Sequence, residues 1–236
     1  MSSEQSVEVS KESYVTDYER YDYSREWANK EIEDLAEKRI LSSWIKSAEA
    51  CLELGGGFGR LTGLFERYFS RVVMMDFSKF NIHRASQNLT KTDIIRSEFQ
   101  KIPFRDETFD YIFLIRVVHH LPDPLVVLKE IERVAKNGCT LVVSAPNPAL
   151  TKYRRLRSNT LVAKGQFGHR IYVAPLNYYS SGGVLKEKAR LGTGMFENFI
   201  GMKLHRLTFL HLADVLVSPL WQLKPNIFMK FTINKN

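Results

Sequence analysis

A glycine-rich turn is the first feature of this sequence whose residues could do chemistry. Residues 53–59 read ELGGGFG, so four glycines occupy the five positions 55–59, and helix-forming residues follow. Glycines in a turn between a strand and a helix let backbone N–H groups approach a bound ligand closely. Arg60 stands where a dinucleotide-binding turn would have its third glycine, and the Gly-Lys-Ser/Thr ending of a P-loop is absent. The turn therefore predicts a site for a nucleotide-like cofactor of another kind.

The second chemical group is the carboxylate that closes the next apolar stretch. Asp76 stands 19 residues after Gly57, at the end of RVVMMD. A carboxylate in that place can accept hydrogen bonds from both hydroxyl groups of a ribose. The alternative is structural, because Glu53 and Asp76 could simply be strand-end carboxylates that accept hydrogen bonds from N–H groups of the loop. In either case the two carboxylates lie beside the glycine turn.

Apolar strands and amphipathic helices alternate around these residues. Nearly continuous Val, Ile and Leu in strands separated by helices is typical of a parallel sheet covered on both faces. Residues 1–150 are therefore predicted to contain a doubly wound α/β domain, in which ligands bind beyond the carboxyl ends of the strands. The predicted strands are 50–54, 71–77, 93–99, 110–118 and 139–146, and the predicted helices are 59–69, 78–89 with Ser78 as N-cap, and 124–135.

The parts on either side of this core differ in composition. Residues 1–12 are polar and predict a flexible tail, whereas residues 13–48 carry apolar side chains at helical spacing and predict a helical cap. Residues 149–180 are rich in basic and aromatic side chains, and we expect them to form an insertion over the carboxyl edge of the sheet. In residues 181–236 we expect a helix at 182–192 and two strands at 195–204 and 225–233. The stretch between these strands, 205–221, is a candidate for a further helix.

The charge of the chain is unevenly distributed. The net charge is +8, with 20 Lys and Arg against 23 Asp and Glu in residues 1–145, and 14 against 3 in residues 146–236. The basic C-terminal part predicts an anionic partner such as a phosphorylated metabolite, nucleic acid or membrane headgroups, with a merely solvated surface as the alternative. Cys51 and Cys139 lie in apolar stretches and are expected to be buried free thiols. Without a signal peptide or a long apolar run, the sequence favours a cytoplasmic protein.

Two further motifs follow the glycine turn in order. They are SEFQKIPFRDETFDYIFLIRVVHHLPDP at 97–124 and LKEIERVAKNGCTLVVSAPN at 128–147. Together with the turn and Asp76, they resemble the class I (Rossmann-like) S-adenosylmethionine-dependent methyltransferases, above all the type 11 branch that includes the ubiquinone and menaquinone C-methyltransferases. The resemblance covers about residues 50–147, and two departures from the usual pattern are Glu98 in place of Asp and KNG in place of KPGG.

The resemblance also implies a complete fold. The sheet would be Rossmann-like, doubly wound and mostly parallel, with seven strands and helices on both faces. A lid would be formed by the N-terminal helix and by the insertion after the fifth strand. Residues 13–236 would then be a single methyltransferase domain. Its parts would be a cap at 13–48, a cofactor-binding core at 49–148, a lid at 149–180 and a C-terminal part of the sheet at 181–236.

The family pattern implies S-adenosyl-L-methionine as the cofactor and assigns its methionine and ribose ends. Gly55, Gly57 and Gly59 would pack against the methionine part. Glu53 would anchor the loop near the amino group, and Asp76 would hold the ribose hydroxyls.

The same pattern implies the contacts of the adenine and of the sulfonium. Phe77 would lie against the adenine face, Glu98 would accept a hydrogen bond from the adenine amino group, and the backbone N–H of Phe99 would meet a ring nitrogen. The backbone of Ile115 and Arg116 would border the sulfonium. Plain core aromatics at 77 and 99 and a solvated charge at 98 are the alternatives.

Methyl transfer from this cofactor is an in-line displacement at the methyl carbon of a sulfonium. The protein aligns the reactants, excludes water and, for some nucleophiles, removes a proton. His119 and His120 are the candidate catalytic bases, and His169 is a weaker one, because an unperturbed histidine titrates near pH ~6.5. The alternative is that the histidine pair packs its loop, as is common in the family, and that His169 has a surface role.

Aromatic residues before the first strand are candidates for contact with the methyl acceptor. Tyr18 and Tyr21, together with His169 of the expected lid, are the predicted substrate-binding residues, and Tyr23 and Trp27 fall under the same question. The alternative is an amphipathic cap helix with its aromatic side chains packed inward.

Absent motifs narrow the acceptor. The fourth strand lacks Asn/Asp-Pro-Pro-Tyr/Phe, which disfavours methylation of base or glutamine amide nitrogens, and Cys139 lacks the Pro-Cys setting of cytosine-5 enzymes. No His and Cys cluster indicates zinc and no carboxylate set indicates magnesium, so no metal is expected. The leading hypothesis is methyl transfer to a small-molecule acceptor, anionic or lipid-like.

Two alternatives stay open at this point. In one, the basic KYRRLR at 152–157 contacts phosphates, and the protein is a tRNA or rRNA methyltransferase. In the other, the chain is a non-catalytic cofactor-binding partner subunit. The acceptor atom, the oligomeric state and any peripheral membrane contact are left open by the sequence.

Overall fold

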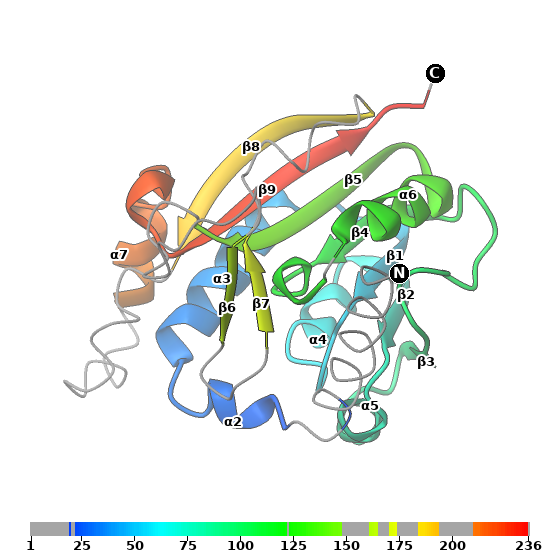
Figure 1. Ribbon diagram of the computed structural model, residues 1–236, viewed down its shortest axis with the longest axis horizontal. Helices are drawn as coiled ribbons and strands as arrows, with labels where there is room; N and C mark the ends of the chain where they lie inside the picture. The colour runs from blue at the N-terminus through cyan, green and yellow to red at the C-terminus, as the bar shows by residue number, and fades with distance from the viewer. Residues whose placement is uncertain are drawn as a thin grey trace, which may run out of the picture.

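One seven-stranded sheet forms the centre of the molecule (Figure 1). The computed structural model describes residues 19, 22–121, 123–147, 161–164, 170–173, 184–193 and 210–235. The predicted fold class, a Rossmann-like seven-stranded α/β sheet, is confirmed. The strands of this sheet are β1 (Ala48–Leu54), β2 (Phe69–Asp76), β3 (Thr92–Arg96), β4 (Phe109–Leu114), β5 (Ala135–Pro146), β8 (Leu185–Thr193) and β9 (Asn226–Ile233).

The strand order β3-β2-β1-β4-β5-β9-β8 creates a switch point at the middle of the sheet. Strands β1 to β5 are parallel, and β9 lies antiparallel between β5 and β8. Leu52 of β1 has Val73 of β2 on one side and Ile112 of β4 on the other. The chain thus moves outward from β1 to β3 and then returns to β4. Ligands bind beyond the carboxyl ends of the strands at such a switch in order.

Two hydrophobic cores cover the two faces of the sheet. Alternate side chains of a strand point to opposite faces, and accordingly Leu52 belongs to one core and Cys51 to the other. The first core is closed by Ile131 of a helix after β4, and the second by Ile40 and Trp44 of a helix before β1. The helices are α2 (Ser24–Trp27), α3 (Glu31–Trp44), α4 (Thr62–Phe65), α5 (Lys79–Ser86), α6 (Pro124–Val134) and α7 (Leu210–Leu216), with 3₁₀ turns η1 (Val118–His120) and η5 (Trp221–Leu223).

Side-chain caps fix where two of these helices begin. The Oγ atom of Ser78 accepts a hydrogen bond from the Asn81 N–H at 3.3 Å, so Ser78 is the N-cap of α5 as predicted. Asp123 caps α6 by accepting from the Leu125 N–H at 3.0 Å, and Pro124 occupies the first helical position, where its missing N–H costs nothing. Because α5 begins almost directly after β2, its capped first turn fixes the path of the chain where β2 ends, at the carboxyl edge of the sheet.

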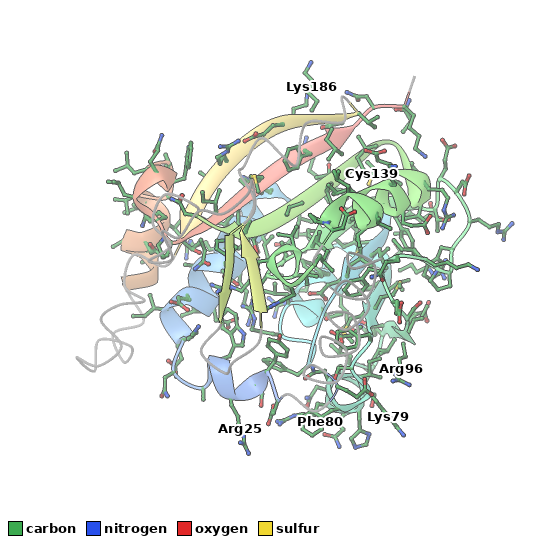
Figure 2. The ribbon with its side chains drawn as sticks, viewed as in Figure 1. Arg25, Lys79, Phe80, Arg96, Cys139 and Lys186 are labelled. Atoms are coloured by element: carbon green, nitrogen blue, oxygen red, sulfur yellow. The ribbon has the colours of Figure 1, made fainter. Side chains whose placement is uncertain are left out.

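The expected helix at 182–192 is wrong, because these residues contain strand β8. Their Leu, Lys, Glu and Ala favour a helix, but β8 pairs with β9 from Leu185 to Thr193, and this tertiary pairing overrides local propensity. β8 is an edge strand of the sheet, and its Lys186 projects outward from that edge (Figure 2). Charged side chains of this kind oppose pairing with the strand of another molecule.

Other boundaries also differ from the prediction. The expected helix at 59–69 is reduced to the four residues of α4, since glycines weaken a helix. Strand β5 begins at Ala135, four residues before the start of the strand expected at 139–146, so that KNG lies within the strand. The candidate helix in 205–221 is confirmed by α7, whereas the strand expected at 195–204 lies outside the described residues.

Part of the expected lid is described. Strands β6 (Leu161–Lys164) and β7 (Arg170–Val173) form an antiparallel pair, and β7 lies beside η1 near the carboxyl end of β4 (Figure 1). The two cysteines are buried and free, as predicted. In the described part of the chain, no helix is long and apolar enough to cross a membrane, and no group of His, Cys, Asp and Glu side chains could hold a metal ion.

Candidate active site

A cavity of about 280 Å³ opens at the switch in strand order. Its walls come from the glycine turn after β1, the end of β2, the turn after β4 and the N-terminal cap. The structure brings together most of the residues predicted from the sequence to bind a cofactor or to act as a base. Those that line the cavity are Glu53, Gly55, Gly57, Asp76, Phe77, Phe99, Ile115, Arg116, His119 and His120.

Two described residues among the remaining predicted ones, Gly59 and Glu98, are not part of the cavity lining. Gly59 has φ +85°, and a Cβ added there would lie 2.9 Å from Leu89 Cδ1, so it packs against the segment that follows α5. The side chain of Glu98 is exposed. For these two residues the expected cofactor contact is not supported by the geometry. Tyr18, Tyr21 and His169 lie outside the described residues.

The glycine turn needs glycine for two different reasons. Gly55 has φ +74°, and a Cβ added there would overlap the side chain of Val117, so the turn after β1 approaches the turn after β4 closely. Gly57 has φ +58°, but an added Cβ would meet nothing within 4 Å. The left-handed conformation disfavours a side chain at both positions. The open space at Gly57, which lines the cavity, exposes backbone to a ligand there.

Asp76 is tied to the glycine turn through its carboxylate. Its Oδ2 accepts a hydrogen bond from the Gly57 N–H at 2.9 Å, and its Oδ1 accepts from the Ser78 N–H at 2.9 Å. Burial raises the pKa of Asp76 above its ordinary value, although the N–H groups of Ser78, Gly57 and Phe77 act in the opposite direction. A carboxylate has about four acceptor positions. Asp76 therefore stabilises the loop and still has acceptor positions for a ligand.

Glu53 is the second buried carboxylate of the cavity. Its Oε2 accepts a hydrogen bond from the Thr62 hydroxyl at 2.5 Å. Burial raises the pKa of Glu53 to about 7; the Thr62 hydrogen bond and Arg60 lower it, and Asp76 raises it further. Glu53 can thus change its protonation state near neutral pH.

Two histidines line the cavity from the turn after β4. The rings of His119 and His120 lie in η1 with their centroids 3.9 Å apart. The ring of Tyr23 lies at 67° to the ring of His120, with the centroids 6.3 Å apart. Just before the histidines, Arg116 has φ +57°, and its N–H donates to Ser144 Oγ at 2.7 Å. This hydrogen bond ties the turn after β4 to β5 and holds the histidines at the cavity.

A buried ion network joins the cap to both turns. Glu37 of α3 is fully buried and accepts hydrogen bonds from Arg60 at 2.6 Å and from Arg116 at 2.7 Å. Arg60 also pairs with Asp34 at 2.6 Å, and its guanidinium carbon lies 3.4 Å from the centre of the Trp27 ring. Burial would raise the pKa of Glu37, but Arg116 and Arg60 together hold that pKa below its ordinary value.

The sequence of this chain is similar to a known family of domains and to proteins of known name. A methyltransferase domain family matches residues 52–143. The demethylmenaquinone methyltransferase of Anoxybacillus flavithermus is 31% identical over 149 residues, which are 63% of this chain and 59% of that protein. Cycloartenol-C-24-methyltransferase 1 of Oryza sativa subsp. japonica is 26% identical over 131 residues, 51% of this chain and 38% of that protein. The chain spans less than two thirds of the length of both relatives.

The chain contains a class I S-adenosylmethionine-dependent methyltransferase domain. A solved structure described as an S-adenosylmethionine-dependent methyltransferase, possible histamine N-methyltransferase, from Thermotoga maritima matches it with a TM-score of 0.69. The match covers 93% of this chain and 99% of that one at 16% sequence identity, and it shows the fold alone. The predicted resemblance to this family is therefore confirmed, as is the expected cofactor.

The sequence prediction missed several residues that line the cavity of this methyltransferase domain, and Arg60 is the charged one among them. Arg60 lines the cavity, and Glu37 holds it there, but neither was expected to do so. The sequence did contain a signal for this contribution. Glu33 and Glu37 stand on the same helical stripe as Ile40 and Trp44, and the buried stripe of a helix is normally apolar. Buried carboxylates need cationic partners. Two acidic residues on an otherwise apolar stripe therefore indicate that cations lie opposite.

Proposed function

We propose that this protein transfers a methyl group from S-adenosylmethionine to a small-molecule acceptor that is anionic or lipid-like. The observation that carries this proposal is the arrangement of the cavity. Gly57 and Asp76 line the cavity from the turn after β1 and the end of β2, and His119 and His120 line it from η1, after β4. A cofactor could thus be held by the first two residues while an acceptor approaches the histidines.

The residues of the turn after β1 and of the end of β2 fit the cofactor. Asp76 has acceptor positions for two ribose hydroxyls, and the open side of Gly57 admits a ligand close to the backbone. We assign the adenine contacts to Phe77 and Phe99 and the methionine end to the surroundings of Glu53. The cofactor, when bound, supplies the activated methyl group, so that the protein has to position the reactants and keep water out.

The two histidines would face the acceptor. His120 is buried beside Tyr23 and is the stronger candidate for removing a proton from an acceptor hydroxyl or amine. The alternative role, packing of the turn, predicts that substitution lowers stability rather than the rate. A small-molecule acceptor is also supported by the relatives, because demethylmenaquinone methyltransferase and cycloartenol-C-24-methyltransferase are both named after small molecules.

Calorimetric titration with S-adenosylmethionine tests the cofactor assignment. We expect binding to the wild type and a large loss of affinity in Asp76→Ala, since the substitution removes the ribose acceptor. Asp93→Ala is the matched control, because Asp93 is an exposed aspartate on the neighbouring strand β3. Absence of binding to the wild type, or equal binding by Asp76→Ala and Asp93→Ala, would contradict the assignment.

Transfer of a labelled methyl group to a cell extract tests the activity and the acceptor class. A labelled small molecule supports the proposal, and labelled RNA supports the second candidate, which rests on the excess of 14 basic over 3 acidic residues in 146–236. RNA binding would then fall steeply with salt. No labelled product, together with intact cofactor binding, supports a non-catalytic partner subunit.

A further inference from the structure

Asn81 is a buried polar residue of the cavity that the cofactor assignments above do not use. It stands in the first turn of α5 and lines the cavity together with Asp76 and Phe77. The exposed fraction of Asn81 is 1%, whereas its neighbour Phe80 is 40% exposed and projects outward from the same helix (Figure 2). Asn81 therefore lies on the inner side of α5, at the cavity.

The side chain of Asn81 is not used by the fold around it. Its backbone N–H donates to Ser78 Oγ at 3.3 Å, as part of the cap of α5, but the side chain takes no part in this cap. The side-chain oxygen of Asn81 is buried, and no described residue donates a hydrogen bond to it. Buried polar groups in folded proteins are nearly always hydrogen-bonded. This oxygen thus needs a partner that the described residues do not supply.

Asn81 lies next to the group to which we assign the ribose. The Ser78 N–H donates to Asp76 Oδ1 at 2.9 Å, and the Ser78 hydroxyl caps the turn that contains Asn81. Ser78 thus links the ribose acceptor to Asn81 by two short contacts. Because the adenine of the cofactor is joined directly to the ribose, a base bound beside Asp76 lies near the first turn of α5.

The other residues assigned to the adenine supply only apolar contact through their side chains. Phe77 and Phe99 line the cavity and offer aromatic faces on which a base can stack. A phenyl ring has no hydrogen-bonding atom for the edge of the base. The carboxylate expected to accept from the adenine amino group, Glu98, is exposed and is not part of the cavity lining. Polar recognition of the base is therefore left to another residue.

The carboxamide of asparagine is complementary to an edge of adenine. It carries an acceptor oxygen and an NH₂ donor side by side in one plane. Adenine presents an amino group, which donates, beside a ring nitrogen, which accepts, and asparagine pairs with these two groups at once. The last torsion of an asparagine side chain is broad, so the carboxamide can turn its oxygen toward the cavity.

We propose that Asn81 recognises the adenine of S-adenosylmethionine, with its oxygen accepting from the amino group and its NH₂ group donating to the adjacent ring nitrogen. This inference rests on the cofactor assignment made under the proposed function. Asn81 would select the base of the cofactor, away from the methyl group that is transferred. Binding of the cofactor would supply the buried oxygen with its partner.

Calorimetric titration with two ligands tests this contact. The ligands are S-adenosylhomocysteine, which carries the same adenine, and its analogue with hydrogen in place of the 6-amino group. The wild type should bind the analogue about tenfold or more weakly. Asn81→Leu, which keeps the approximate size, should bind S-adenosylhomocysteine about tenfold or more weakly than the wild type and should bind both ligands about equally. Asn88→Leu is the matched control, since Asn88 is an exposed asparagine just after α5.

Urea unfolding without ligand separates recognition from a structural role. Replacing a polar group that has no partner by an apolar one of similar shape is nearly neutral or stabilising. Asn81→Leu should therefore unfold at the same urea concentration as the wild type or at a higher one. A lower midpoint together with unchanged ligand affinity would show that Asn81 serves the fold and would overturn the proposal. Asn81→Ala, with a smaller side chain, should lose the preference for the amino group as well, and it covers the case that leucine does not fit.

Two other results would also overturn the proposal. One is a preference for the amino group that persists in both Asn81→Leu and Asn81→Ala, and the other is loss of that preference in Glu98→Ala instead. Wild-type binding of S-adenosylhomocysteine that does not depend on Asn81 refutes only this inference. Absence of any binding to the wild type refutes the cofactor assignment as well, so the two failures are distinguishable.

Discussion

Replacing Glu37 by glutamine tests the buried ion network that joins the cap to the cavity. Glu37 is fully buried, and its carboxylate lies between the guanidinium groups of Arg60 and Arg116. Glutamine has almost the same shape and keeps one oxygen that can accept a hydrogen bond, but it removes the negative charge. The two arginines, which are themselves 11% and 22% exposed, would then face each other with less compensation.

The expected cost follows from this geometry. Removing one partner of a buried ion pair typically costs about 3–5 kcal/mol, because the other charge stays buried. Arg60 retains Asp34 and glutamine retains one acceptor, so we expect about 3 kcal/mol for Glu37→Gln. Asp34→Asn is the control: Asp34 is more exposed and also pairs with Lys38, and exposed pairs are worth about 0–1 kcal/mol.

Urea unfolding at neutral and at acidic pH provides the measurement. The pKa of Glu37 lies below its ordinary value of 4.5, so its contribution to the free energy of unfolding is present above that value and is lost as the pH falls through the folded-state pKa. The difference between wild type and Glu37→Gln should therefore shrink in acid. A neutral-pH loss for Glu37→Gln no larger than that for Asp34→Asn would refute the reasoning.

Three further predictions concern other parts of the fold. Both Gly55 and Gly57 have positive φ, so Gly57→Ala should destabilise the protein by about 1–2 kcal/mol. Gly55→Ala should cost more, because only at Gly55 would the added Cβ meet a side chain. Equal losses in thermal unfolding would contradict this. The pKa of Glu53 is raised from its ordinary value of 4.5 to about 7. The stabilisation that this shift provides is present below pH 4.5 and is lost as the pH rises through about 7. In Glu53→Gln, the free energy of unfolding should therefore depend less on pH over that range. Lys224→Met should cost about 3–5 kcal/mol in urea unfolding because it removes the cation beside the buried Asp214 carboxylate, and Lys224→Met/Asp214→Leu should recover part of that loss.

Local patterns were sufficient to predict the parallel half of the sheet. Apolar runs such as the one that ends at Leu54, the glycine turn after it and Ser78 as N-cap all act within a few residues, and the structure follows them. Strand β8 was predicted wrongly because its residues favour a helix, and its state depends on pairing with β9, which is more than 30 residues away along the chain. Pairing at such a distance leaves no local signal.

The candidate site was predictable to the same extent. Glycine and carboxylate positions after β1 and β2 follow from spacing, and they lie together at the cavity. The contribution of Arg60 depends on Glu37 of a separate helix, so spacing around the turn could not predict it. Gly59 shows the opposite case, since its positive φ and its contact with Leu89 serve the fold, although its place in the motif suggested the cofactor.

The position of β9 has a consequence for the order in which the sheet can form. β8 precedes β9 in the chain, yet β9 lies between β5 and β8. Within the described sheet, β8 therefore has no strand to pair with until β9 has left the ribosome. The five parallel strands can assemble earlier, with β5 as a temporary edge whose unpaired N–H and C=O groups invite wrong partners. During synthesis, the N–H and C=O groups on the free edge of β5 therefore stay unpaired until β9 is made and pairs with them.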